Sequence, residues 1–203
     1  MSKIKKLTFI LAVACTWLVL SQPNVGETEP TPARPFNIDA ASSKFVVKGT
    51  SSLHDWEMAT ESGVSGYIEC DEGQTDDLCI TAIKLSVDVK TLKSGKSLMD
   101  KKCYDALKED KFPKIKYNFE KVSSLDKQAD GTFQTVLVGD VTIAGVTKKT
   151  TVNAKVQFNG TTVKITGAKD MKMSDFDVEP PKALMGTIKT GNEITVEFNL
   201  NFK

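Results

Sequence analysis

The stretch from residue 131 to residue 168 constrains the fold of this 203-residue chain more than any other. Apolar and polar side chains alternate through it with a period of two, in three runs. The apolar phases hold Phe133, Leu137, Val141 and Ile143, then Val146, Val152, Ala154, Val156 and Phe158, then Val163 and Ile165. Successive side chains of a β-strand point to opposite faces, so each run predicts a strand with one apolar and one polar face.

Two glycine-containing dipeptides separate these runs. Ala144-Gly145 lies between the first two, and Asn159-Gly160 lies between the second two. Asn-Gly accepts the positive φ values that a tight two-residue hairpin turn requires. The stretch is therefore predicted to form an antiparallel meander with one dry face.

Similar alternation continues on both sides of the meander. Further strands are predicted over residues 45–48, 53–58, 64–70, 79–89, 115–119 and 194–202. The last strand alternates without interruption and is expected to pair along both edges, which favours closure of the sheet into a barrel. The chain thus has the strand content of an all-β domain, and an eight-stranded closed sheet is wide enough to hold one slender ligand.

One helix is predicted to interrupt the strands, over residues 97–108. Ser97, with Asp100 three residues later, is typical of a capping box at a helix N-terminus. One face of the helix is apolar and carries Met99, Cys103, Ala106 and Leu107. This narrow apolar face favours a lid over one end of the barrel rather than a helix inside the core.

Residues 171–185 break the strand pattern. Pro180-Pro181 removes two ladder donors, so the segment is predicted to be a crossing loop. Its apolar side chains adapt to irregular surfaces, and they are Met171, Met173, Phe176, Val178, Leu184 and Met185. Two readings stay open, packing over the core and a rim that contacts a ligand.

The N-terminus has the composition of an export signal. Lys3, Lys5 and Lys6 precede an uncharged apolar run from Leu7 to Leu20, which is shorter than a membrane-spanning helix needs. We predict a signal peptide over 1–21, a proline-rich linker over 22–35 and one domain over 36–203. Lipidation at Cys15, which would bring membrane contact, and an uncleaved anchor are the alternatives.

Two cysteines flank the predicted hairpin loop between residues 71 and 78. In an exported protein, Cys70 and Cys79 at the ends of such a loop favour a disulfide. Two buried thiols are the alternative. Cys103 is then left over.

Several function classes lack support in the sequence. The 27 basic and 26 acidic residues give no charge bias toward nucleic acid. A single histidine cannot build a zinc site, and no phosphate-binding glycine loop follows a strand. Ser51, His54 and Asp55 have the residue types of a catalytic triad, but adjacent strand residues point to opposite faces. We therefore predict no catalytic site, no metal and no cofactor.

His54 shares its predicted strand face with Trp56 and Met58. One reading is a core histidine that a neighbouring carbonyl satisfies. The other is a polar anchor at one end of an apolar cavity, because ligand sites are mostly apolar with a few placed polar groups.

Five sequence blocks, in order, resemble the YceI-like lipid- and polyisoprenoid-binding family. They are Leu53-His54-Asp55-Trp56, Met99-Asp100 with Tyr104 and Leu107, Phe112-Pro113-Lys114-Ile115, residues 139–147 (GDVTIAGVT) and residues 173–186 (MSDFDVEPPKALMG). The resemblance covers residues 36–203. The cysteines at 70, 79 and 103 and the proline linker lie outside the family pattern.

The resemblance implies an extended, eight-stranded antiparallel barrel that is lipocalin-like in shape. It also implies a periplasmic protein, a monomer or a homodimer, whose apolar tunnel holds an isoprenoid chain such as a polyprenyl lipid or a quinone tail. We expect Val87 and Val152 to point inward as well. The expected ligand-binding residues are His54, Trp56, Met99, Tyr104, Leu107, Tyr117, Phe119, Val141, Met173, Phe176, Leu184 and Phe198.

His54 or Tyr104 would meet the polar head of the ligand. Two other functions remain as alternatives. One is an interaction module of the cell envelope, whose filled barrel holds no ligand. The other is an enzyme that acts on a bound lipid.

Overall fold

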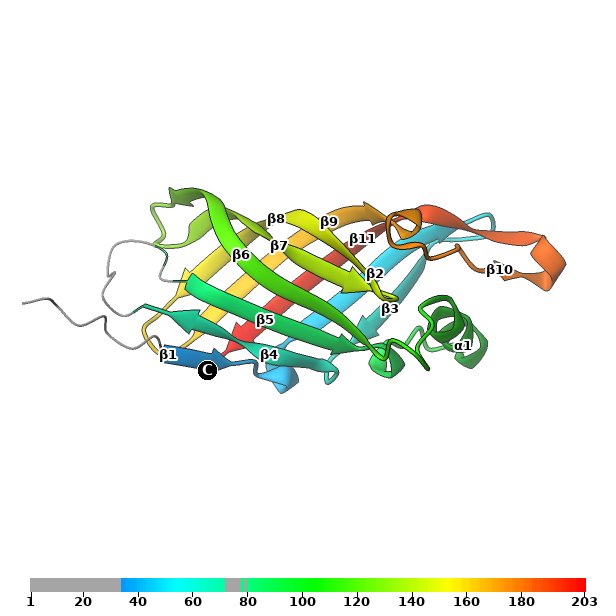
Figure 1. Ribbon diagram of the computed structural model, residues 1–203, viewed down its shortest axis with the longest axis horizontal. Helices are drawn as coiled ribbons and strands as arrows, with labels where there is room; N and C mark the ends of the chain where they lie inside the picture. Colours follow the sequence, from blue (N-terminus) through cyan, green and yellow to red (C-terminus); the bar gives the residue numbers. More distant parts are fainter. Residues whose placement is uncertain (1–33, 72–77, 79) are drawn as a thin grey trace, which may run out of the picture.

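The protein folds into one long antiparallel sheet that curls around its own apolar face (Figure 1). The computed structural model describes residues 34–71, 78 and 80–203, apart from the side chains of Ala183 and Leu184. The strands are β1 Arg34–Asn37, β2 Lys44–Ser51, β3 Trp56–Thr60, β4 Val64–Cys70, β5 Ile80–Asp88, β6 Lys114–Lys127, β7 Phe133–Ile143, β8 Val146–Phe158, β9 Val163–Lys172, β10 Lys182–Ala183 and β11 Ile188–Phe202.

The strand order along the sheet is β1-β4-β5-β6-β7-β8-β9-β11-β2-β3, with β10 paired to β11. Every pairing is antiparallel, and β11 pairs with both β9 and β2 as expected. The predicted class, an all-β antiparallel barrel with one helix, is confirmed as a curled half-barrel. The ordered path holds ten strands rather than eight, because the short strands β1 and β3 form its two edges.

The two edges of the sheet are tied to other parts of the chain. Asn37, the last residue of β1, exchanges two backbone hydrogen bonds of 2.9 Å with Lys203, which follows β11. On the opposite edge, Ala59 of β3 exchanges two backbone hydrogen bonds of 2.9 Å with Lys93. These bonds occupy part of the backbone groups that each edge strand would otherwise expose to another chain.

One end of the half-barrel is filled by large apolar side chains. Phe36 from β1, Ile68 from β4 and Phe202 from β11 are almost completely buried there. Val156 and Val163 fill the space between them from β8 and β9. Burial of each such side chain stabilises the fold by about 1.5–3 kcal/mol, so this end is a packed core.

The opposite end carries the only α-helix of the described residues, α1 Ser97–Ala106, and the β10–β11 hairpin (Figure 1). Four short 3₁₀ turns complete the secondary structure of the described part of the chain: η1 Ala40–Ser42, η2 Val89–Thr91, η3 Met173–Phe176 and η4 Leu184–Gly186. No helix within residues 34–71 and 80–203 combines the length and the apolar character that crossing a bilayer would take.

Two local predictions need correction. Asp100 does not cap Ser97, because its carboxylate accepts hydrogen bonds from the backbone N–H and the hydroxyl of Ser94, at 2.8 and 2.6 Å. Asn159-Gly160 starts a four-residue loop rather than a two-residue turn, because the Asn159 side-chain oxygen accepts the N–H of Thr162. The other predicted turn, Ala144-Gly145, is a two-residue turn with positive φ at both residues.

The predicted signal peptide and nearly all of the linker lie outside the described residues. Cys79 also lies outside them, so its disulfide with Cys70 stays a prediction. Cys70 itself is buried at the end of β4.

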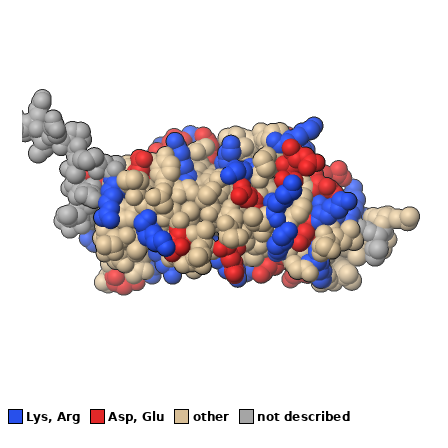
Figure 2. Space-filling model, turned by 90° about the horizontal axis from the view of Figure 1, so that it is seen from below, with Lys and Arg blue, Asp and Glu red and all other residues tan. Residues whose placement is uncertain are grey.

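Charged side chains of both signs are interspersed on the outer surface (Figure 2). Several form ion pairs across neighbouring strands, such as Lys48 with Glu197 at 2.7 Å and Lys114 with Asp88 at 3.2 Å. Exposed pairs of this kind contribute little stability each. The curl of the sheet therefore depends on its apolar inner face.

Gly66 in β4 provides a test of the close strand packing. Its φ is +139°, and a Cβ atom there would lie 2.0 Å from the backbone oxygen of Lys84. We expect Gly66→Ala to lower the free energy of unfolding by about 3 kcal/mol or more, measured by urea denaturation. Gly160→Ala is the control, because Gly160 also has positive φ but faces open space, and it should cost only about 1–2 kcal/mol. Equal losses would contradict this account.

Candidate ligand-binding cavity

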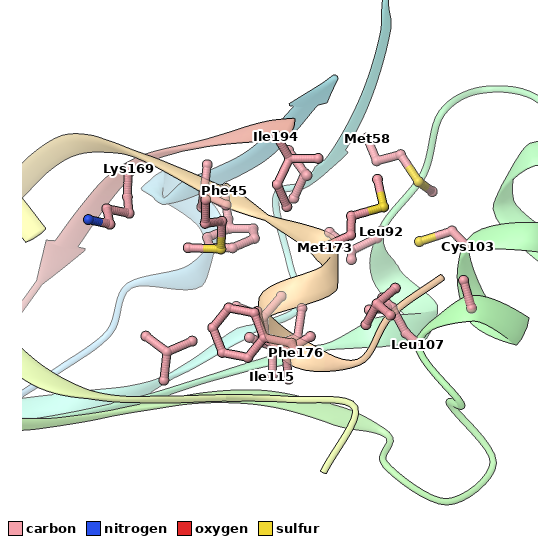
Figure 3. A pocket seen from close by; sticks show the side chains of 18 of the residues that line it. Phe45, Met58, Leu92, Cys103, Leu107, Ile115, Lys169, Met173, Phe176 and Ile194 are labelled. Carbon is pink, nitrogen blue, oxygen red and sulfur yellow. The ribbon is translucent and has the colours of Figure 1, made fainter. Parts of the chain in front are cut away.

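A cavity of about 430 Å³ occupies the curled sheet at the α1 end. Its walls come from β2 to β9 and from β11, and α1 and the η3 turn border its opening (Figure 3). This volume lies within the usual range for small-molecule sites. The dry face predicted from the alternating pattern thus encloses space, in contrast to the packed opposite end.

The strand register explains why the wall is apolar. Val47 of β2 pairs with Met58 of β3 on one side and with Val196 of β11 on the other, and all three side chains line the cavity. On the other wall, Tyr117 of β6 pairs with Leu85 and with Val141, and these line it too. Because paired residues share a face of the sheet, the inward phase of each strand continues into the next.

Three aromatic rings on the wall each cover a glycine of a neighbouring strand. A Cβ atom on Gly49 would lie 2.3 Å from the Trp56 ring, and one on Gly167 would lie 2.6 Å from the Phe198 ring. The Tyr117 ring covers Gly139 in the same way. A ring that rests on a glycine lies against the wall, so these pairs keep large side chains from filling the cavity.

The helix and the loop after β9 border the opening. Met99, Cys103, Ala106 and Leu107, the predicted apolar face of α1, all line the cavity. In Figure 3, Cys103 extends from α1, Leu107 directly follows the last residue of α1, and Met173 and Phe176 belong to the η3 turn.

The 171–185 segment packs over the core and also lines the cavity, and its contact with a ligand stays a prediction. Met173 and Phe176 line the cavity. Phe176 and Val178 are also buried against Val141, Ile143 and Ala144. The same segment therefore packs on the core and forms part of the rim.

His54 lies in the loop before β3 and is exposed, so it is not a core histidine. The strand predicted from residue 53 begins only at Trp56, because the Ser51 hydroxyl bonds to Leu53 and His54 backbone groups and holds a turn. The imidazole Nδ1 is 2.7 Å from the Asp55 carbonyl oxygen. That oxygen can only accept, so Nδ1 carries the proton. His54 stands at the cavity rim with no triad partner.

Tyr104 does not line the cavity. Its hydroxyl lies 2.9 Å from the carbonyl oxygens of Lys90 and Leu92, and it accepts a hydrogen bond of 2.7 Å from Lys93. The ring therefore anchors α1 to the segment after β5. This placement removes Tyr104 from the residues that can meet a ligand head.

The other predicted residues divide as follows. Phe119 is half-buried in the core beside the cavity and does not line it. The Leu184 side chain lies outside the described part of the chain. Val87 and Val152 point into the cavity as expected. The predicted site residues that line the cavity are His54, Trp56, Met99, Leu107, Tyr117, Val141, Met173, Phe176 and Phe198.

Two titratable groups of the lining have raised pKa values. Burial, with a smaller effect of the nearby Asp100 carboxylate, raises the pKa of the Cys103 thiol to about 12. Burial alone raises the pKa of Tyr117 to about 12. Both groups are therefore neutral at physiological pH, and Cys103 has little of the thiolate character that a nucleophile needs.

The Tyr117 hydroxyl is buried, and it has no hydrogen-bond partner among the protein atoms of the described residues. Buried polar atoms in folded proteins usually have a partner. It is therefore a donor at the cavity wall that the protein itself does not satisfy.

Sequence reasoning missed several lining residues, among them Leu92, Ile115, Lys169 and Ile194. Lys169 had a usable signal. The inward phase of β9, set by Val163 and Ile165, continues through Gly167 to Lys169 and Met171. No group of three or more His, Cys, Asp or Glu in the described ranges is arranged to hold a metal ion.

Comparisons with known proteins give one family and a set of structural relatives. Residues 36–202 match the family model of the YceI-like domain. No sequence among curated proteins matches the chain.

Solved structures share the fold at low sequence identity. BcnA from Burkholderia cenocepacia is 20% identical, with a TM-score of 0.64 over 81% of this chain and 98% of BcnA. A polyisoprenoid-binding domain from Saccharophagus degradans is 14% identical, with a TM-score of 0.65 over 83% of this chain and 97% of that domain. The YceI protein of Campylobacter jejuni is 15% identical, with a TM-score of 0.55 over 69% and 81%.

A matched pair of tyrosine variants tests the two hydroxyls. We expect Tyr117→Phe to leave the stability of lipid-free protein unchanged or slightly higher, because it removes an unsatisfied buried group. Tyr104→Phe should lower the free energy of unfolding by about 1–2 kcal/mol, because it breaks hydrogen bonds around α1. Urea denaturation of both variants measures the difference, and a larger loss for Tyr117→Phe would refute the assignment.

Proposed function

Because the chain belongs to the YceI-like domain family, we propose that it is a lipid-binding protein that holds an isoprenoid chain in its cavity. The observation that carries the proposal is the cavity of about 430 Å³ with an apolar wall from nine strands of one sheet. The polyisoprenoid-binding domain from Saccharophagus degradans, which shares the fold, supports an isoprenoid as the ligand.

The physical basis is burial of a slender apolar chain. Each CH₂ group that leaves water contributes about 0.8 kcal/mol, so several isoprene units would offset the cost of immobilising the ligand. Few polar contacts are needed for such affinity. A polyprenyl lipid and a quinone tail both meet this requirement.

We propose that residues of the wall contact the apolar chain and that residues of the rim contact it at the opening. Trp56, Val141 and Phe198 would contact the chain along the wall, and Met99 and Met173 would adjust to it at the opening. His54 would stand beside the opening, exposed to solvent. The family resemblance and the cavity give these roles together.

Binding rather than catalysis fits the chemistry of the lining. The Cys103 thiol is held neutral by burial, and Ser51 uses its hydroxyl for the backbone of its own turn. An interaction module with a filled barrel is the weaker alternative, because the space at the α1 end would then have no role.

The proposed location follows from the sequence of residues 1–35. A basic start and a short apolar run are typical of an export signal. We propose that the mature protein acts in the periplasm, as a monomer or a homodimer. Lipidation at Cys15 would instead tether the domain to a membrane through the proline-rich linker.

A larger side chain on the cavity wall should prevent lipid binding. Val152 points inward from the middle of β8, and Asn153 beside it points outward and is exposed. We expect Val152→Trp to lower the lipid that co-purifies with the protein by about tenfold or more, because the larger ring occupies the space of the chain. Organic extraction of protein from its own host, followed by mass spectrometry, measures the lipid.

Asn153→Trp is the control and should keep its lipid. Circular dichroism of both variants checks that the sheet is intact. An isoprenoid load that is absent from the parent protein, or equal in both folded variants, would overturn the proposed function.

A further inference from the structure

Lys169 is a cation on the inward phase of β9. It pairs with Val196 of β11, and Asn153 of β8 pairs with Ala168, so Val152 is its next neighbour on the other side. Val152 and Val196 both line the cavity, as Lys169 does. In Figure 3 the Lys169 side chain stands at one side of the labelled lining residues.

The protein offers Lys169 no counter-ion. The cavity lining includes six lysines and neither Asp nor Glu, although acidic and basic groups are interspersed outside (Figure 2). Lys169 has no ion-pair or hydrogen-bond partner among the described residues. The neighbouring acids on the outer face are engaged elsewhere, Asp170 with Thr195 at 2.6 Å and Glu197 with Lys48.

The other lysines of the lining differ from Lys169. Lys172 and Lys182 lie 4.0 and 3.0 Å from Glu193 and Glu179. Lys102 donates a hydrogen bond of 2.7 Å to the Lys182 carbonyl oxygen. Lys96 and Lys116 are exposed. Only Lys169 combines partial burial, the inward phase and the absence of a partner within the described residues.

Two neutral donors face the same part of the cavity. Thr150 of β8 pairs with Gly139, the glycine that the Tyr117 ring covers. Thr150 and Tyr117 both line the cavity, and the Tyr117 hydroxyl has no partner in the described protein. The Thr150 hydroxyl donates a long hydrogen bond of 3.4 Å to the Lys148 carbonyl oxygen, which it would exchange for a bond to the ligand. Val152 is level with Lys169 across the sheet, and Thr150 precedes Val152 by two residues on β8, toward the opening. The two hydroxyls therefore lie closer to the opening than Lys169 by about one cavity-facing residue.

A lone ammonium group beside apolar walls is unfavourable unless an anion pairs with it. We infer that Lys169 binds the anionic head of the lipid inside the cavity, with Tyr117 and Thr150 as further hydrogen-bond donors. The ligand class is an amphiphile with a carboxylate or phosphate head on an apolar chain. This inference rests on the proposed function and adds to it the charge and the position of the head.

A neutral head fits these groups less well. A quinone carbonyl can accept a hydrogen bond, but it leaves the charge of Lys169 uncompensated. A carboxylate or a phosphate accepts the charge-assisted hydrogen bond and supplies further oxygens for the two hydroxyls. The head rather than the chain therefore decides which lipid this cavity retains.

Binding of paired probes with one chain and two heads tests the inference. Farnesyl phosphate is compared with farnesol, and palmitate with hexadecanol, on delipidated protein by quenching of Trp56 and by calorimetry. We expect the charged member to bind about 10- to 100-fold more tightly in at least one pair, as for a hydrogen bond to a charged group. The pair with the larger ratio identifies the head as phosphate or carboxylate.

Lys169→Met should bring that ratio close to one without weakening the neutral probe, because the substitution keeps the length and removes the charge. Lys169→Arg should keep most of the preference. Lys164→Met is the matched control, since Lys164 lies on the same strand, is exposed and points outward, and it should change nothing.

The outcomes separate the two proposals. A neutral probe that binds as tightly as its charged partner, or a preference that survives Lys169→Met, would overturn the role of Lys169 and leave the lipid-binding function standing. A parent protein that binds none of the four probes would overturn the function itself.

Discussion

The structure depends on one constraint: a sheet with one apolar face must hide that face from water. The alternation of apolar and polar residues seen in β7, from Phe133 onward, recurs in the other long strands. The sheet therefore curls, and its inner side chains meet. At one end Phe36, Ile68 and Phe202 fill the interior. At the other end the same face surrounds an open volume. A single hydrophobic surface thus forms both the core that stabilises the protein and the wall of the candidate ligand-binding cavity.

The contrast between the two ends arises from how aromatic residues are placed. Phe36 and Phe202 project into the interior and are almost fully buried. Trp56 and Phe198 instead lie over Gly49 and Gly167 of adjacent strands, where any side chain would displace the ring. Large apolar surface is then present on the wall without occupying the lumen. The positions at which a glycine faces an aromatic residue therefore decide which end of the sheet is packed and which end encloses a cavity. The alternation of apolar and polar residues alone does not decide this.

Features that depend on local periodicity could be predicted from the sequence. The prediction failed where a single side chain redirected the backbone. It also failed on β9, where the alternation of inward residues was not extended past Gly167. The meander and the apolar face of α1 were predictable because their patterns repeat. The position of His54 was not, since the Ser51 hydroxyl bonds to the next residues and delays the strand. The role of Tyr104 depends on carbonyl groups twelve and fourteen residues away in sequence. The inward position of Lys169 was not predicted, because Gly167 before it interrupts the apolar alternation.

Apolar walls alone give affinity with little selectivity, because one CH₂ group contributes about as much as another. Discrimination between lipids must then come from the few polar atoms that face the cavity, and an unsatisfied polar atom is the most selective kind. A ligand that forms a hydrogen bond with such an atom binds more tightly. A ligand that covers the atom without a hydrogen bond leaves it buried and unsatisfied, which weakens binding. Tyr117 and Lys169 are both of this kind in the described protein. Under the proposed function, the apolar wall at the α1 end would discriminate little between chains, so the choice among lipids would depend on what their heads offer to these two side chains.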